Sequence, residues 1–312
     1  MIVHFLSLHA IVLICVVAKI PRISCSEVSS ISNLDKVSCT GENRVLHLTD
    51  NDYAARRKTD SAPPQCELRC GRVARCLLIH HQNSQSQRIF WLLEELEIPY
   101  NLELHTRQES GAERSRAPAE LRKTHPLGKA PQLITADGRV IIESTAIAKY
   151  LLKTYDTTGT FAGDGHKNDW IRNEELSSLA ANSLQPILVL DLVFQQLTKR
   201  SPFFIRPIFS ATHKQLQKLF IGPEVMKLLA YLDDQFGDQE YLMGIAPGEA
   251  DFILSWPIDS MVNTSDCARL EDYPKLNAWH KRCKARPAWQ RSIEKGNGYF
   301  SATMAHDFVG GK

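Results

Sequence analysis

A short stretch near the middle of the chain, residues 128–155, limits most strongly what this sequence can fold into. It reads GKAPQLITADGRVIIESTAIAKYLLKTY, with two apolar segments around the turn Ala136–Gly138. Asp-Gly is a strong hairpin signal, so we predict strands over residues 132–135 and 139–142. Apolar residues then recur at helical spacing, which predicts a helix with Ser144 as its N-cap. A hairpin leading into a helix places unpaired backbone N–H groups at a strand end, where an anion can bind.

The preceding segment predicts a strand, a helix and a second strand. Residues 76–80 (CLLIH) form an apolar run typical of a buried strand, and residues 100–105 are the second candidate. The helix between them has one apolar stripe and is expected to turn Glu94 and Glu95 toward solvent. Strand, helix, strand followed by strand, strand, helix is the thioredoxin-like order, in which the first two strands are parallel.

After residue 156 the chain is expected to be helical. Residues 156–166 (DTTGTFAGDGH) have the composition of a linker. The helix that follows is predicted to be kinked or interrupted at Pro186. A later helix begins after Pro247, where Asp251 is placed to bond back to the helix start. Gly248 stands at the cap position, so the hydroxyl of a complete capping box is missing.

Composition sets the limits of the function. The chain has 312 residues, enough for two domains, and its net charge of +2 gives no general attraction to nucleic acid. Its 8 cysteines include no Cys-x-x-Cys pair, and no His or Cys pair follows the early ones at a useful spacing. We therefore expect neither a dithiol redox site nor a bound metal.

The first 72 residues do not resemble a folding unit. Phe5–Ala18 is an apolar run, shorter than a membrane span needs, and no Lys or Arg precedes it. The residues after it, up to 72, are polar and irregular and are expected to be disordered. Three interpretations stay open: a secretory or anchor segment, a transit-like or disordered tail, or upstream sequence joined by a gene-model error. We favour the last, because the pattern from Ala74 onward needs nothing before it.

Two motifs in the first domain resemble the glutathione S-transferase family. One is Pro131 followed by Glu143-Ser144 at the head of a helix. The other is HHQNSQSQRIFWLLEELEIPY, which is similar to the start of fungal and bacterial members with a serine or asparagine in the loop. The resemblance covers roughly residues 74–295. It implies a thioredoxin-like N-terminal domain over 73–156, then an all-helical C-terminal domain over 167–300.

The resemblance also implies where glutathione, the co-substrate, would bind. In the family the proline is cis, and the backbone of the residue before it, here Ala130, pairs with the cysteinyl part of glutathione. Glu143 would take the ammonium group of the γ-glutamyl end and Ser144 its carboxylate. Lys129 stands where relatives place a residue that reaches the glycyl carboxylate.

The thiol needs an activator, because an ordinary thiol has a pKa near ~8.5 and only the thiolate is the nucleophile. Ser84 lies four residues before Arg88, matching the serine of theta-like members. Asn83 lies one residue earlier, where other serine-type classes place theirs, and its amide can also donate. Ser86 is a third candidate, although it also suits the N-cap of the following helix.

These residues predict an enzyme that conjugates glutathione to apolar electrophiles and also reduces organic peroxides. The alternative is a non-catalytic protein-association module with the same fold. The resemblance further implies a homodimer. We expect a cytoplasmic location, because the cysteines after residue 76 are isolated and glutathione is abundant where thiols stay reduced.

Overall fold

A computed structural model of the chain describes residues 75–81, 83–106, 117–162, 169–296 and 299. The chain divides into a first unit, Met1–Gln65, and a second, Cys66–Lys312. The expectations for residues 1–72, including the apolar run Phe5–Ala18, therefore lie outside the described residues.

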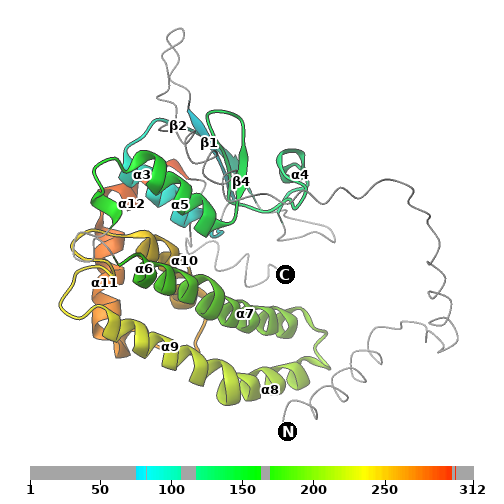
Figure 1. Cartoon of the computed structure of the whole chain (residues 1–312). Helices are drawn as coiled ribbons and strands as arrows, with labels where there is room; N and C mark the ends of the chain where they lie inside the picture. Colours follow the sequence, from blue (N-terminus) through cyan, green and yellow to red (C-terminus); the bar gives the residue numbers. More distant parts are fainter. Residues whose placement is uncertain (1–74, 82, 107–116, 163–168, 297–298, 300–312) are drawn as a thin grey trace, which may run out of the picture. The chain divides into compact units, whose positions relative to one another are not determined.

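A four-stranded mixed sheet forms the centre of the first domain (Figure 1). Its order is β2-β1-β3-β4, with β1 parallel to β2 and the other two pairs antiparallel. The strands are β1 (Cys76–His81), β2 (Tyr100–His105), β3 (Gln132–Ile134) and β4 (Val140–Ile142). The parallel pair flanks a helix, and the antiparallel hairpin leads into another, so the thioredoxin-like order is confirmed.

Two helices pack against this sheet and against each other, α3 (Ser86–Leu96) and α5 (Ser144–Tyr155) (Figure 1). Ile89, Leu92 and Leu93 of the apolar stripe of α3 are fully buried, and Trp91 beside them contacts the rings of Phe252 and Trp289 edge-on. Because those two rings belong to later helices, α3 joins the cores of both halves of the protein. The short helix α4 (Leu121–Thr124) lies in the connection to β3.

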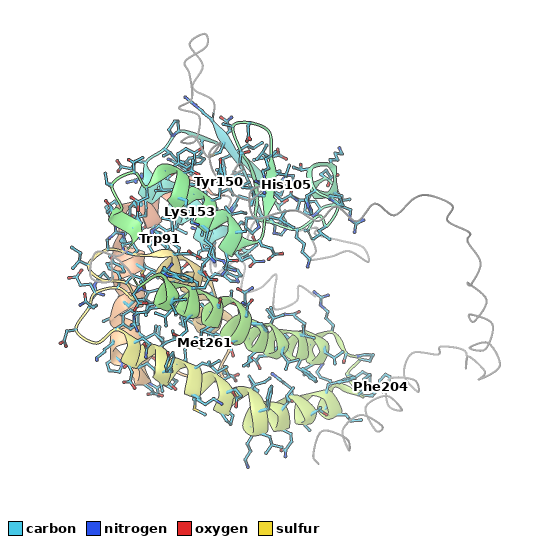
Figure 2. The ribbon with its side chains drawn as sticks, viewed as in Figure 1. Trp91, His105, Tyr150, Lys153, Phe204 and Met261 are labelled. Carbon is cyan, nitrogen blue, oxygen red and sulfur yellow. The ribbon has the colours of Figure 1, made fainter. Side chains whose placement is uncertain are left out.

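The second half of the described chain is all helical, as expected. Helices α7 (Gln185–Arg200) and α8 (Arg206–Leu216) pack side by side (Figure 1). Phe204, 67% exposed, lies in the turn that joins them (Figure 2). The helices are α6 (Trp170–Ser178), α7 (Gln185–Arg200), α8 (Arg206–Leu216), α9 (Gly222–Gln235), α10 (Glu249–Thr264), α11 (Pro274–Ala285) and α12 (Pro287–Lys295), with short 3₁₀ turns η2 (Thr160–Ala162) and η6 (Leu270–Asp272).

Two segments in this half are π-helical, η4 (Leu179–Leu184) and η5 (Gln217–Ile221). Pro186 was expected to kink or interrupt its helix. The α-helical hydrogen bonding changes to π-helical in η4, directly before Pro186, which is the second residue of α7, and the chain stays helical through this turn. The helix thus runs from Trp170 to Arg200, and within the described ranges it alone is long and apolar enough to span a membrane. A core helix of a soluble protein meets the same criterion.

Asp251 fixes the start of α10, as the sequence suggested. Its carboxylate accepts hydrogen bonds from the backbone N–H of Gly248 at 2.8 Å and of Leu242 at 3.0 Å. Trp279 of α11 donates its indole N–H to the same carboxylate at 2.7 Å. Burial raises the pKa of Asp251 to about 6, although these hydrogen bonds oppose the shift. One buried side chain therefore joins the connector, α10 and α11.

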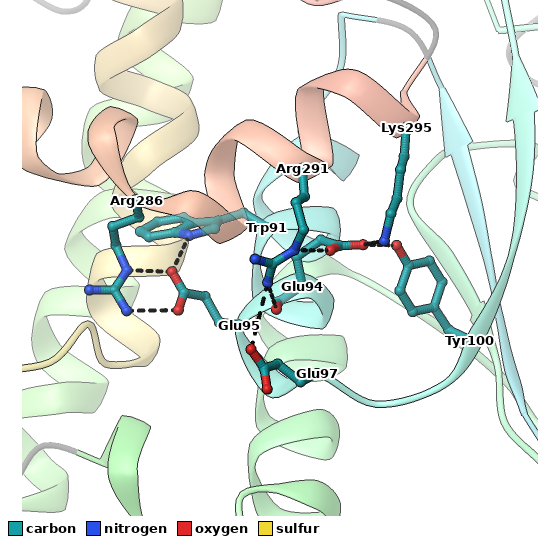
Figure 3. Close-up of polar contacts among 8 residues, drawn as sticks. All are labelled: Trp91, Glu94, Glu95, Glu97, Tyr100, Arg286, Arg291 and Lys295. Carbon is teal, nitrogen blue, oxygen red and sulfur yellow. Dashed lines mark hydrogen bonds and ion pairs between the residues drawn. The ribbon is translucent and has the colours of Figure 1, made fainter.

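The two glutamates expected to face solvent instead hold α12 against α3 (Figure 3). Glu94 is only 4% exposed and accepts from Arg291 at 2.8 Å and Lys295 at 2.6 Å. Tyr100 also donates to Glu94. The expectation was wrong because α12 covers a helix face that local periodicity assigns to water.

Candidate functional site

The strand register brings the predicted site residues to one end of the sheet. Gln132 at the start of β3 pairs with Ile79 near the end of β1 and with Ile142 at the end of β4. Pro131 therefore lies beside the exit of β1, and Glu143 follows directly at the exit of β4. The loop from β1 to α3 leaves from the same end, so segments about 60 residues apart in sequence meet there.

The Ala130–Pro131 peptide bond is cis, as the resemblance implied. The loop before it is fixed by the buried side chain of Gln132, which donates to the carbonyl oxygen of Lys129 at 2.9 Å and of Leu121 at 3.1 Å. Lys129 itself is exposed at this loop. The arrangement holds the backbone of residues 129–131 in one position while leaving the lysine side chain open to solvent.

Glu143 adopts an unusual backbone conformation at the head of α5. Its φ is 67° and ψ is 121°, a region that a non-glycine residue enters at a cost of order 1–3 kcal/mol. Its side chain is exposed, whereas Ser144 is 4% exposed. Ser144 is the first residue of α5 and makes no side-chain cap, so its predicted N-cap role is wrong. Its hydroxyl instead donates to the side-chain oxygen of Gln85 at 3.2 Å.

The loop between β1 and α3 contains a compact hydroxyl cluster. Ser84 Oγ donates to the carbonyl oxygen of His81 at 2.7 Å and lies 2.6 Å from Ser86 Oγ. Asn83 is 4% exposed and has a φ of 47°, which asparagine tolerates better than most residues. Ser84 is partly exposed, so it is the hydroxyl of the cluster that an added molecule can reach.

Ser86 is fully buried within this cluster. Its Oγ accepts from the backbone N–H of His81 at 3.1 Å and lies 3.1 Å from His80 Nδ1. Its expected N-cap role is wrong, because Gln85 occupies that position and Ser84 Oγ accepts from the Ser86 backbone N–H at 3.2 Å. These contacts make Ser86 a support for the loop.

His80 packs in the core and is 1% exposed. Its ring meets Phe90 edge-on with centroids 5.3 Å apart. Burial lowers the pKa of His80 to about 4, so the imidazole is neutral at physiological pH. Across the described ranges no three His, Cys, Asp or Glu side chains gather as a metal site would require.

Sequence reasoning assigned no contact at the site to three polar residues: Gln85, Arg88 and Gln185. Arg88 is 1% exposed and bonds to the Ile253 carbonyl oxygen at 3.0 Å and to Gln185 Oε1 at 2.8 Å. Gln85 is signalled weakly, by its place between two candidate serines. Gln185 carries no sequence signal, because it reaches the loop from a helix 100 residues away.

A thioredoxin-like domain with a cis-proline loop, followed by an all-helical domain, defines the class of glutathione S-transferases. Comparison with family models agrees at both ends of this architecture. The model described as "Glutathione S-transferase, N-terminal domain" matches residues 84–154, and "Glutathione S-transferase, C-terminal domain" matches residues 197–287. The chain belongs to the glutathione S-transferase family, and the expected enzyme class, a transferase, is confirmed.

Individual relatives align with about two thirds to three quarters of this chain. "Glutathione S-transferase 3" of Schizosaccharomyces pombe is 28% identical over 70% of this chain and 87% of its own length. "Glutathione S-transferase 1" of Saccharomyces cerevisiae is 27% identical over 68% and 92%. A crystal structure of a glutathione S-transferase from Actinobacillus pleuropneumoniae is 27% identical, with a TM-score of 0.59 over 75% of this chain and 99% of that one.

Proposed function

We propose that this transferase attacks apolar electrophiles with the thiolate of glutathione. The observation that carries the proposal is the meeting of four elements at one end of the sheet: the Ser84 loop, the cis Ala130–Pro131 bond, Glu143 and Ser144. A glutathione transferase from Phanerochaete chrysosporium was crystallised with oxidized glutathione, and a glutathione transferase homolog from Lodderomyces elongisporus with two glutathione molecules per subunit. Both share the fold of this chain.

Glutathione would lie across this end of the sheet. The backbone of Ala130, ahead of the cis-proline, pairs with its cysteinyl unit. Glu143, exposed and negatively charged, takes the ammonium group. Ser144, with the N-terminal N–H groups of α5 beside it, takes the γ-glutamyl carboxylate. Lys129, exposed at the loop, reaches the glycyl carboxylate.

The same geometry favours the thiolate. The loop of Asn83 and Ser84 stands directly before the N-terminus of α3, whose positive end favours a negative charge. A hydroxyl or amide hydrogen bond to the sulfur adds to this effect. Ser84 is the preferred donor, because it is partly exposed while Asn83 and Ser86 are buried. The thiolate then displaces a leaving group or opens the electrophile, or attacks the O–O bond of an organic peroxide.

The test is binding to immobilised glutathione, followed by turnover with aryl halides, epoxides, isothiocyanates and organic peroxides. We expect retention that free glutathione reverses, and turnover with at least one electrophile. A folded protein that is neither retained nor active contradicts the proposal.

A non-catalytic association module is the alternative, and one observation favours it. Ser84 already donates to the carbonyl oxygen of His81, so its hydrogen must leave that partner before it can reach a thiol. Retention on immobilised glutathione with no turnover for the whole panel would support this alternative.

We also propose a homodimer and a cytosolic location. Several apolar side chains on α7 and α8 are exposed, and exposed apolar surface that gathers into a patch marks an interaction site. They include Val189, Val193 and Ile208, at 48%, 55% and 58% exposure. A monomer mass for the full chain in light scattering at micromolar concentration contradicts the dimer. For the cytosolic location, the test is to express the tagged chain. Finding it in the medium, or finding that glycosidase treatment lowers its mass, contradicts this location.

A further inference from the structure

Three hydrogen-bond donors converge on one atom beside the proposed glutathione site, the side-chain oxygen of Gln85. Ser144 Oγ lies 3.2 Å from it and Gln185 Nε2 lies 3.3 Å from it. Arg88 Nη2 donates to the same oxygen. An amide oxygen has two lone pairs, so the three donors compete, and the two longer contacts are the weaker ones.

The donors come from three different parts of the fold. Arg88 lies in the first turn of α3, three residues after Gln85, and Ser144 is the first residue of α5. Gln185 begins α7, directly after the π-helical turn η4, and belongs to the all-helical domain. Its Oε1 also accepts from Arg88 at 2.8 Å, so Gln85, Arg88 and Gln185 form a closed three-residue contact.

Arg88 brings a buried positive charge to this contact. It donates hydrogen bonds to neutral oxygens: the backbone carbonyls of Gln85 and Ile253 and the side-chain amides of Gln85 and Gln185. Burial lowers its pKa to about 9, so the guanidinium stays charged near neutral pH. The charged guanidinium and the hydroxyl of Ser144 therefore share one acceptor, the side-chain oxygen of Gln85.

We propose that Gln185 is a positioning residue for Ser144, acting through the shared oxygen of Gln85. This inference rests on the proposed function. Ser144 has one hydroxyl hydrogen, and a γ-glutamyl carboxylate would take it from Gln85. The Gln85 oxygen then keeps Arg88 and Gln185, two donors for two lone pairs, so the release of Ser144 leaves no lone pair unpaired.

The test is the glutathione dissociation constant of the full-length protein, measured by titration calorimetry. Gln185→Met removes both amide contacts with little change in size. We expect the dissociation constant to rise about 3- to 10-fold, the range of one or two neutral hydrogen bonds. Gln195→Met is the matched control. Gln195 is also half-buried on α7 and donates to Asp191 at 2.8 Å, outside the Gln85 contact. We expect its dissociation constant to change by less than about 2-fold.

A double-mutant cycle separates positioning from general damage. If Gln185 acts through Ser144, Gln185→Met changes the dissociation constant by less than about 2-fold when Ser144→Ala is already present. Circular dichroism and thermal unfolding check that each variant is folded. Additive effects in the cycle, or equal effects of Gln185→Met and Gln195→Met, overturn the inference while the proposed function stands. Failure of the wild-type protein to bind glutathione overturns both.

Discussion

Arg286 and Glu95 form a two-pronged ion pair between residues 191 positions apart in the sequence (Figure 3). Nη2 lies 2.7 Å from Oε2, and Nε contacts Oε1. Trp91 also donates its indole N–H to Glu95 at 2.8 Å. The Glu95 side chain is 6% exposed, against 29% for Arg286. The pair joins α3 to the start of α12, and the hydrogen bonds to Glu95 raise the pKa of Arg286.

Replacing Arg286 by Met should lower the free energy of unfolding by about 2–3 kcal/mol, because a buried carboxylate loses its partner. The loss is below that for a fully buried pair, since Arg286 is partly exposed. Urea unfolding followed by tryptophan fluorescence measures it. Lys227→Met is the control, since Lys227 pairs with Glu224 while 66% exposed, and should cost below about 0.5 kcal/mol. Equal losses would contradict the role given to burial.

Glu249→Gln should change the pH dependence of stability. Burial raises the pKa of Glu249 to about 7, although Lys149 lies 4.0 Å from its carboxylate. An acid with a raised folded-state pKa favours folding most at low pH. That contribution is lost as pH rises from the unfolded value of about 4.5 to about 7. The variant should therefore be about 1–3 kcal/mol more stable than wild type at pH 8, with the difference vanishing near pH 4.5.

Urea unfolding of both proteins between pH 4.5 and 8.5 measures this difference. Glu174→Gln is the control, because Glu174 pairs with the same Lys149 but is 45% exposed, so its effect should stay below about 1 kcal/mol. A Glu249→Gln protein less stable than wild type at pH 8 would show that the Lys149 attraction exceeds the burial cost.

Gly248→Ser should destabilise the protein, although serine is a better N-cap than glycine in an isolated helix. A Cβ at residue 248 would lie 2.8 Å from Met243 Cγ and 3.0 Å from Met243 Cβ, closer than packing allows. We expect a loss of about 1 kcal/mol in thermal or urea unfolding. In a Met243→Ala background, which removes Cγ and keeps Cβ, the same change should cost less stability than it does beside Met243. A gain in stability with Met243 present contradicts the steric argument.

Ser84→Ala should raise the pKa of bound glutathione thiol by roughly one to two units, if Ser84 is the donor. A hydrogen bond to a charged group contributes about 1.5–3 kcal/mol, and one unit corresponds to ~1.36 kcal/mol. Thiolate absorbance against pH measures the shift, and glutathione affinity should barely change. Asn83→Ala is the comparison, and a shift there alone moves the assignment by one residue. Ser86→Ala should mainly lower stability, because Ser86 is buried among four polar contacts.

The sequence by itself determined the local elements of the first domain and their order. Asp137-Gly138 between two apolar segments is a strong hairpin signal, and the apolar stripe of α3 follows from helical periodicity. The family resemblance added Pro131, Glu143 and Ser144, and the register placed all three at one end of the sheet. The division at residues 73–156 and 167–300 stays a prediction.

The tertiary structure decided what no local pattern encodes. Glu94 and Glu95 lie on the face that periodicity assigns to solvent, yet α12 covers them. Helical periodicity shows which face of a helix is polar, but not which other element packs against that face. Gln185 contacts Gln85 from 100 positions away in the sequence. Ser144 donates its hydroxyl hydrogen to Gln85 and does not cap its own helix. Hydrogen bonds depend on distances that only the packed chain sets, so the elements could be predicted from the sequence, while the partners of their polar side chains were decided by packing.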